Sequence, residues 1–215
     1  APAPRADIAS APSEDAAVVS QAIFGVNIGV LEVQPGWVKI RTPDEYTGWV
    51  AQASVLRSAE PYAVEGVQVE SLFANLYREP DVTKHQPLLT LPYEARLEVA
   101  SVRDERWMEV RLPGGATAWV QRGDVSAGRP HASIPELIAF SKRFLGLPYL
   151  WGGTSTFGYD CSGFTQMLCR RRGIAIPRDA APQAHWEGMA AVDRSALEPG
   201  DLLYFGSSQE KITHT

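Results

Sequence analysis

One cysteine in the C-terminal third of the 215-residue chain has surroundings that suit a nucleophile. Cys161 lies in the run Asp-Cys-Ser-Gly. The apolar residues Phe164, Met167 and Leu168 follow with the spacing of one buried helical face, which predicts that a helix begins at the cysteine. Free N–H groups and the positive end of the helix dipole stabilise a thiolate there, and the thiolate is the nucleophilic form. The competing interpretation is a small buried core residue, the commonest role of a free cysteine.

A cysteine hydrolase also needs a base for the leaving group and donors for the tetrahedral oxyanion. Histidine suits the role of base because its pKa lies near neutral pH. The chain has four histidines. Three are expected to be solvated surface residues: His85 among turn residues, His131 in a linker and His185 on a polar helix. The fourth, His214, directly follows a strand-like Ile-Thr pair.

The second cysteine is not expected to pair with the first. Cys161 and Cys169 are eight residues apart on one predicted helix, which is about 12 Å of axial rise and too far for a disulfide. Cys169 is expected to belong to the core. The cysteine content therefore does not indicate a redox compartment.

Charge and composition exclude several classes. A net charge of −5 without a basic stripe argues against binding nucleic acid. No apolar run approaches the roughly 20 residues that span a bilayer. The start of the sequence, Ala-Pro-Ala-Pro-Arg, lacks the basic and apolar regions of a signal peptide, so no export signal is visible.

The N-terminal half carries an internal repeat. The run 37–43, Trp-Val-Lys-Ile-Arg-Thr-Pro, matches the run 107–113, Trp-Met-Glu-Val-Arg-Leu-Pro. The same offset of 70 residues relates a Trp-Val pair at 49–50 to one at 119–120, and Val55 to Val125. Upstream, the triplet Leu-Glu-Val at 31–33 aligns with the one at 97–99, which makes the following turn four residues longer in the second copy. The repeated tryptophans are expected to be core residues rather than a ligand platform.

Turn residues divide each copy into short strands. Strands are predicted at 30–33, 37–41 and 48–50, joined by turns at 34–36 and 43–44. Residues 1–15, rich in Ala, Pro and Ser, are predicted to be an irregular arm. Two β domains are predicted at 16–57 and 67–126. Linkers rich in Pro, Gly and polar residues follow at 57–66 and 126–131.

Helix signals dominate the rest of the chain. Ser133 and Pro135 predict the start of a helix that ends near Gly146. A further helix is predicted from Ala180 to Met189, and an extended segment at 174–177. After the turn at 199–201 a strand is predicted from 202 to 205, and His214 is expected near the start of the next strand.

Four motifs together resemble a known family. They are Tyr-Leu-Trp-Gly-Gly at 149–153, Asp-Cys-Ser-Gly-Phe at 160–164, Pro-Gly-Asp-Leu-Leu-Tyr-Phe at 199–205 and Ile-Thr-His at 212–214. In this order and at this spacing they resemble the NlpC-type cysteine peptidases of the bacterial cell wall, over residues 134–215. The half-buried β repeats resemble bacterial SH3 domains. The resemblance implies an α+β chain with two small all-β SH3-like barrels followed by a papain-like peptidase domain at 132–215, without metal or cofactor.

Site residues follow from the resemblance, position by position. It implies Cys161 as nucleophile, His214 as base, and the Tyr149 hydroxyl with the Cys161 N–H as oxyanion donors. An α-amine on the substrate needs a carboxylate, and a substrate carboxylate needs donors or an arginine. The residues implied on the amine side are Asp160 and Tyr46. Those implied on the D-Glu side are Ser162, Arg178 and Asp179. Ala180 stands where the family often has a serine, which removes one donor.

The implied activity is cleavage of the γ-D-Glu to diamino acid bond in peptidoglycan stem peptides with a free N-terminal L-Ala. The implied protein is monomeric and lies in the cell envelope, periplasmic or secreted, with cytoplasmic recycling of cell-wall peptides as the other compartment. One alternative is a cell-wall-binding SH3 repeat protein with an idle hydrolase domain, and another is a papain-like amidase or acyltransferase.

The end of the chain bears on this choice. In the family further strands and a polar residue that orients the histidine follow His214, whereas this sequence stops at Thr215. A chain truncated there is expected to lose most of its activity, because a base without its orienting partner loses its tautomer and geometry.

Overall fold

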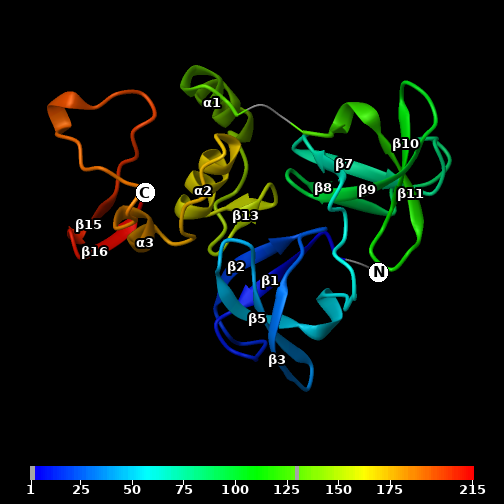
Figure 1. Cartoon of the computed structure of the whole chain (residues 1–215), viewed down its shortest axis with the longest axis horizontal. Coiled ribbons are helices and arrows are strands. Elements are labelled where there is room, and N and C mark those ends of the chain that lie inside the picture. The colour runs from blue at the N-terminus through cyan, green and yellow to red at the C-terminus, as the bar shows by residue number, and fades with distance from the viewer. Residues whose placement is uncertain (1–2, 129–130) are drawn as a thin grey trace.

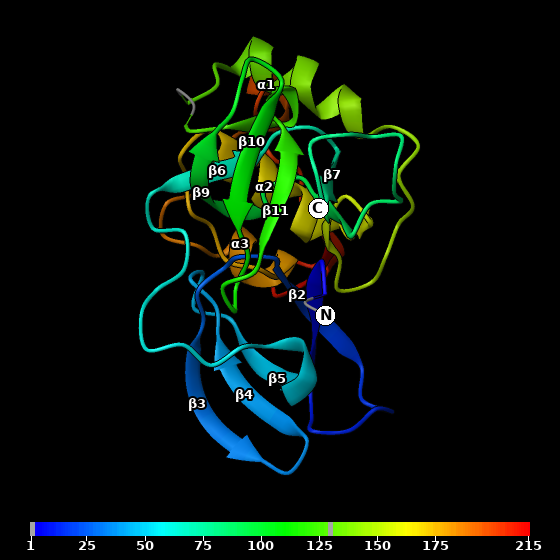
Figure 2. The same ribbon diagram turned by 90° about the vertical axis from the view of Figure 1, so that its right-hand side faces the viewer.

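The computed structural model describes residues 3–128 and 131–215. Two β-rich parts precede a mixed α/β part, so the fold class is α+β as predicted. The first β module (residues 5–54) lies below the C-terminal domain (residues 131–215), and the second β module (residues 66–126) lies beside that domain (Figure 1; Figure 2 gives the view turned by 90°).

The first β module is one antiparallel sheet with the strand order β2-β1-β5-β4-β3. Its strands are β1 (Arg5–Ala9), β2 (Val18–Ile23), β3 (Gly29–Gln34), β4 (Trp37–Arg41) and β5 (Thr47–Ala51). A short 3₁₀ turn, η1 (Gln52–Ser54), follows. The strands predicted from the turn signals are confirmed.

The predicted N-terminal arm is wrong for residues 5–9, which form β1. This strand pairs with β2 along its length and meets β5 at Trp49. Its residues alternate in the two-residue period of a half-buried strand, with Ala6 and Ile8 inside and Asp7 outside. The Ala, Pro and Ser around the strand obscured this alternation. Residues 1–2 of the predicted arm lie outside the described part of the chain.

The second β module is a sheet with the order β12-β6-β9-β10-β11-β7-β8. Its strands are β6 (Gly66–Val69), β7 (Phe73–Tyr77), β8 (Leu89–Pro92), β9 (Arg96–Val102), β10 (Trp107–Arg111), β11 (Thr117–Gln121) and β12 (Val125–Ser126). The 3₁₀ turn η2 (Arg122–Asp124) follows β11 as η1 follows β5. Strands β1 to β5 and β7 to β11 therefore occur in the same spatial order, which confirms the repeat.

The alignment upstream of the first tryptophan is wrong. Val33 lies opposite Val38, and Val102 lies opposite Met108, the residue 70 positions after Val38. Val33 therefore corresponds to Val102, and the turn is one residue longer in the second copy, not four. The two Leu-Glu-Val triplets have the same sequence but do not occupy equivalent positions in the two modules. Leu97 is fully buried opposite Val67 of β6, a strand without a counterpart in the described part of the first module.

The first predicted linker is free of regular secondary structure except at its last residue, and the second is described only in part. Residues 57–65 contain no helix or strand, and residues 129–130 of the second linker lie outside the described part. Trp49 and Trp107 are buried, which confirms the prediction for these two, whereas the tryptophans at 37 and 119 are only half-buried.

The C-terminal domain contains three α-helices and two small hairpins in its described residues. The helices are α1 (Ile134–Ser141), α2 (Cys161–Arg171) and α3 (Ala180–Ala184), with 3₁₀ turns η3 (Lys142–Phe144) and η4 (Arg194–Ala196). The strands are β13 (Thr154–Ser155) with β14 (Gly158–Tyr159), and β15 (Phe205–Ser208) with β16 (Lys211–His214).

The predicted start of α1 is confirmed in detail. The Ser133 side chain accepts from the Glu136 N–H, and the Glu136 carboxylate accepts from the Ser133 N–H, which completes a capping box. The helix ends at Ser141 and continues as η3 to Phe144, so it is shorter than predicted.

Three other boundaries differ from the prediction. Helix α3 ends at Ala184, because the next residue, His185, leaves the helical conformation and its ring nitrogen takes the Ala181 carbonyl as partner. Strand β15 begins at Phe205, because the segment just before it has no strand opposite. His214 ends β16 rather than beginning a strand.

The core of the C-terminal domain extends into the second module. Tyr93 of that module packs with Phe140 and Phe144, at ring-centroid distances of 5.4 and 5.8 Å. Tyr159 and Met167 complete the buried cluster. By contrast, β15 is exposed along its length, and the hairpin that it forms with β16 packs on α3 (Figure 1). Among the described residues, no helix has the length and apolar character needed to cross a membrane.

Candidate active site

Cys161 is the first residue of α2, as the sequence predicted. Asp160 caps this helix, because its carboxylate accepts from the Gly163 N–H at 2.7 Å. The first N–H groups of an α-helix have no partner within the helix, and the Cys161 backbone N–H instead meets the Tyr149 hydroxyl, so both donors lie at one point beside the sulfur. The half-exposed sulfur thus lies where a nucleophile and an oxyanion donor occur together.

The Tyr149 hydroxyl lies 3.9 Å from the Cys161 sulfur. Partial burial and the negative charge of the neighbouring Cys161 thiolate raise the pKa of Tyr149. The phenol therefore stays protonated near neutral pH and remains a donor. The structure brings these two predicted site residues together.

Asp160 and Arg178 form a bidentate buried ion pair, with distances of 2.7 Å from Nη2 to Oδ2 and 3.1 Å from Nη1 to Oδ1. Only 2% of Arg178 is exposed. Its Nη1 also donates to Ser162 at 2.9 Å, and its Nε donates to Ser20 of β2 at 3.1 Å. Asp160, Ser162 and Arg178, all predicted at the site, are therefore tied to one another and to the first β module.

The Asp160 carboxylate is fully engaged. Besides Arg178, its oxygens accept from the Gly152 N–H at 3.0 Å, the Gly163 N–H and the Ser162 hydroxyl. The sequence-based assignment gave Asp160 and Arg178 to opposite charges of a substrate. In the structure they instead pair with each other next to the nucleophile, and each neutralises the charge of the other. The sequence did not reveal this role.

Tyr46 of the first module meets Asp179 of the C-terminal domain. The Tyr46 hydroxyl donates to the Asp179 carboxylate, and burial, with the nearby Asp179 charge, raises the pKa of Tyr46 to about 12. Burial raises the pKa of Asp179, and the charges of Asp160 and Asp44 add to this while Arg178 and the Tyr46 bond oppose it. Two predicted substrate residues from different domains thus lie side by side.

A hairpin just before the nucleophile is held by both β modules. Gln21 of β2 accepts from the Thr154 N–H at 3.1 Å and the Ser155 hydroxyl at 3.0 Å. The buried Thr156 hydroxyl donates to the Leu72 carbonyl of the second module at 2.6 Å. These junction residues were missed, because polar residues in short strands give no signal in the sequence.

The ring at the tip of the same hairpin also touches both modules. Phe157 packs 5.3 Å from the ring of Phe73 in the second module, and the guanidinium of Arg5 in the first module lies 5.1 Å from the Phe157 ring. The hairpin is therefore wedged between the two copies of the repeat.

His214 is not joined to the nucleophile. Its ring lies 6.1 Å from that of Phe205, and in the described part of the chain it forms no hydrogen bond with Cys161 or Tyr149. The other three histidines are exposed, as predicted. His85 lies 3.4 Å from Glu79, and His185 bonds the Ala181 carbonyl.

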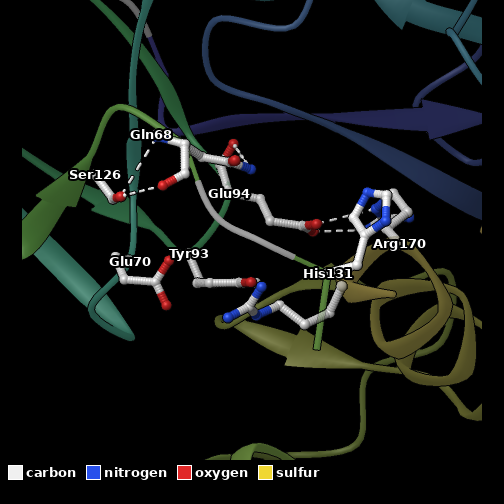
Figure 3. A pocket seen from close by; sticks show the side chains of 9 residues that line it. Gln68, Glu70, Tyr93, Glu94, Ser126, His131 and Arg170 are labelled. Atoms are coloured by element: carbon white, nitrogen blue, oxygen red, sulfur yellow. Dashed lines mark hydrogen bonds and ion pairs between the residues drawn. The ribbon is translucent and has the colours of Figure 1, made fainter. Parts of the chain in front are cut away.

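A cavity of about 190 Å³ lies between the second module and α2, apart from Cys161. Figure 3 shows its wall, where Arg170 of α2 and Glu94 form a bidentate pair at 2.6 and 3.0 Å. The other lining residues are Gln68, Glu70, Tyr93, Ser126, Gly128, His131 and Arg171. Across the described residues, no group of three or more His, Cys, Asp or Glu side chains could hold a metal ion.

Comparison with known families gives a match for the N-terminal module and for the C-terminal domain. Residues 146–215 match the NlpC/P60 family, and residues 8–55 match the bacterial dipeptidyl-peptidase Sh3 domain. The C-terminal domain is an NlpC/P60 domain. It carries Cys161, Tyr149 and the Asp160–Arg178 pair, and the first β module is its SH3 domain. The family resemblance seen in the sequence is confirmed.

Similar proteins share this organisation. A gamma-D-glutamyl-L-lysine dipeptidyl-peptidase of Bacillus cereus is 36% identical over 212 residues, covering 89% of this chain and 61% of the relative. A protein of the same name from Bacillus subtilis is 29% identical, covering 92% of this chain and 67% of the relative. The crystal structure of an NlpC/P60 family protein from Bacillus cereus superposes with a TM-score of 0.84 at 29% identity, covering 99% of this chain and 84% of that one. The chain thus spans about six tenths of the length of the first relative.

Proposed function

We propose that this chain acts as a cysteine endopeptidase that hydrolyses the γ-D-Glu to diamino acid bond of peptidoglycan stem peptides. The observation that carries the proposal is the pairing of Cys161, at the N-terminus of α2, with the Tyr149 hydroxyl 3.9 Å from its sulfur. The chain that holds this pair is 36% identical to a relative named gamma-D-glutamyl-L-lysine dipeptidyl-peptidase.

The geometry supports acyl transfer through a thioester. The Cys161 thiolate attacks the amide carbon, and the oxyanion accepts hydrogen bonds from the Cys161 N–H and the Tyr149 hydroxyl. The leaving amine takes a proton, which we assign to His214, and water then hydrolyses the thioester. Contacts between base and nucleophile often tighten only in the substrate complex.

The charges around the cleft support a substrate with a free amine. The negative charges of Asp160 and Asp44 contribute to the raised pKa of Asp179, whereas the nearby Arg178 opposes it. Asp179 is exposed and bonded to Tyr46. We propose that Tyr46 and Asp179 receive the N-terminal L-Ala end, which moves Asp179 from the D-Glu side implied by the resemblance, and that the mutually neutralised Asp160 and Arg178, with Ser162, form the floor of the site.

The test is digestion of L-Ala-γ-D-Glu-diaminopimelate and L-Ala-γ-D-Glu-L-Lys, followed by mass spectrometry. We expect release of the dipeptide L-Ala-D-Glu and the free diamino acid, and no release by Cys161→Ala. His214→Ala should abolish cleavage, whereas His85→Ala, at an exposed histidine of the second module, should leave it unchanged.

Acetylating the substrate N-terminus should cost about 2 kcal/mol or more in transition-state binding, because the carboxylates lose their cationic partner. Equal rates for free and acetylated peptides would contradict the requirement for a free amine. Retention of intact peptidoglycan without cleavage of any peptide would instead support a cell-wall-binding protein.

A further inference from the structure

The turn that carries Tyr46 has a counterpart in the second module. In the first module the Thr42 N–H donates to the Tyr46 carbonyl at 2.9 Å. The Leu112 N–H donates to the Ala116 carbonyl at 2.7 Å, at positions 70 residues later. A second bond is also repeated, from Glu45 to the Thr42 carbonyl and from Gly115 to the Leu112 carbonyl, each at 2.9 Å. The two turns therefore share the same pair of hydrogen bonds, although Gly114 is left-handed (φ of 95°) and its counterpart Asp44 is not.

The residues in the two turns differ. The first turn contains Asp-Glu-Tyr at 44–46, and the second contains Gly-Gly-Ala at 114–116. Glu45 adopts φ of 63° and Gly115 adopts φ of 91°, so the backbone at this position is left-handed in both. That conformation suits glycine and strains glutamate. Because Gly-Gly-Ala closes its turn with the same two hydrogen bonds, these bonds do not explain the residues of the first copy.

Contacts with the C-terminal domain explain two of them. The Tyr46 hydroxyl bonds Asp179. The Asp44 carboxylate accepts from Gln166 Nε2 at 2.9 Å, while its other oxygen accepts from the Thr42 hydroxyl within the turn. In the second copy, a side chain at Gly114, the counterpart of Asp44, would meet Leu56 at 3.7 Å and no atom of the C-terminal domain within 4 Å, and nothing lies within 4 Å of the side-chain position at Gly115. The first turn is thus docked and the second is open.

Gln166 is the centre of this docking. It lies on α2, five residues after Cys161, and only 2% of it is exposed. Its Nε2 donates to Asp44 and to the Ile176 carbonyl at 3.1 Å, and its Oε1 accepts from Arg170 at 2.9 Å.

Arg170 extends the chain of contacts to the second module through its pair with Glu94 (Figure 3). One helix therefore carries the nucleophile at its first residue and binds both β modules farther along. Gln166 is the member of this helix that reaches the turn of Tyr46.

We propose that Gln166 is a positioning residue that sets the Tyr46 turn against the nucleophile helix and thereby determines affinity for the free-amine end of the peptide. This inference rests on the proposed function. Gln166 touches neither Cys161 nor Tyr149, so its loss should raise KM and leave kcat nearly unchanged. A residue that supported only the helix would alter kcat as well, because the nucleophile is on that helix.

The test is a pair of changes that reverses one hydrogen bond. Gln166→Glu places a carboxylate against the half-buried Asp44 carboxylate and takes the donor from the Ile176 carbonyl, so it should raise KM for L-Ala-γ-D-Glu-diaminopimelate about tenfold or more. Adding Asp44→Asn returns a donor to the pair, with the polarity reversed, and should recover much of the lost affinity. A double variant no better than Gln166→Glu would overturn the proposal, and so would an unchanged KM in the single variant.

A turn exchange supplies a variant whose fold the second module supports. Replacing residues 44–46 by Gly-Gly-Ala should preserve the melting temperature within a few degrees and raise KM as much as Gln166→Glu. The matched control replaces residues 114–116 by Asp-Glu-Tyr and should leave KM unchanged. Equal KM values in both exchanges would overturn the proposal.

A substrate-free measurement separates this inference from the proposed function. In a protein with ¹³C-labelled tyrosine, the Tyr46 ring resonance, assigned through Tyr46→Phe, should shift in Gln166→Glu and return in the double variant. If the wild type neither binds nor cleaves the tripeptide, the proposed function fails, and the resonance alone then decides on Gln166. A resonance unchanged by Gln166→Glu would overturn the positioning role.

Discussion

The two β modules have one strand order, and both form polar bonds with the C-terminal domain, but among the described residues only the second adds a side chain to that domain's aromatic core. The second module contributes an aromatic side chain, Tyr93, to a buried cluster with Phe140 and Phe144. The first module has no residue in that cluster and contributes buried polar acceptors, Ser20 for Arg178 and Gln21 for the hairpin before Cys161.

This difference has a physical meaning. Apolar contact depends on buried area and tolerates small shifts, whereas hydrogen bonds fix direction and distance. The second module therefore anchors the C-terminal domain, and the first orients the site. Since both modules share a fold, the division of roles comes from a few side chains at their surfaces rather than from the sheets.

The largest effect is expected at the anchor. Tyr93→Ala should lower the free energy of unfolding by about 3–5 kcal/mol, because it removes a buried ring from an aromatic cluster. Urea denaturation measures the change. Tyr46→Ala, a half-buried tyrosine in the first module, is the matched control and should cost much less. Similar losses at both positions would contradict the division between anchor and orienting module.

A smaller effect is expected at the polar junction. Gln21→Ala leaves the Thr154 N–H and the Ser155 hydroxyl buried without their acceptor, which should cost about 1–3 kcal/mol. Cleavage should fall more than stability, because the hairpin leads directly into Asp160 and Cys161. Gln68→Ala, at an exposed position of the second module, should change neither quantity.

The two turns give a reciprocal pair of changes. Glu45→Gly relieves a left-handed glutamate and should stabilise the protein by up to about 1 kcal/mol, and Gly115→Glu should destabilise it by about the same amount. Thermal denaturation of both variants tests the shared backbone. A loss of stability in Glu45→Gly would show that the Glu45 side chain contributes more than its backbone conformation costs.

The smallest effect concerns pH. The pKa of Asp179 is raised by burial above its ordinary value of 3.8, so its ionisation opposes folding at neutral pH. Its contribution to stability is fully present below pH 3.8 and is lost as the pH rises through the raised value. Asp179→Asn keeps an acceptor for Tyr46 and should raise the melting temperature at pH 7. The gain should disappear below pH 3.8, and a gain that is independent of pH would contradict this origin.

Local patterns in the sequence predicted much of this protein. Apolar spacing located α2 and Cys161 at its start, the capping signals located α1, and the 70-residue offset matched β4 and β5 with β10 and β11. The pattern failed at β1, where five alternating residues lie among Ala, Pro and Ser. It also failed at the turn before the first tryptophan of each copy, because hydrogen-bonded strand pairing, and not similarity of the sequence, sets the register there.

Only the tertiary structure decided how the domains share the site. The sequence indicates that Asp160 and Arg178 are charged residues near a nucleophile, but their bidentate pairing is fixed by Ser20 of β2, which accepts a hydrogen bond from Arg178. In the same way, the sequence gives no sign that Gln166 differs from other helical residues. Only the structure shows that its amide donates to Asp44, 122 positions away. Local propensity and periodicity act over a few residues, so they determine elements and the nucleophile's place on its helix. Contacts between residues far apart in the chain depend on the packing of whole modules. Of two turns closed by the same hydrogen bonds, that packing brings only the one at 42–46 to the nucleophile helix.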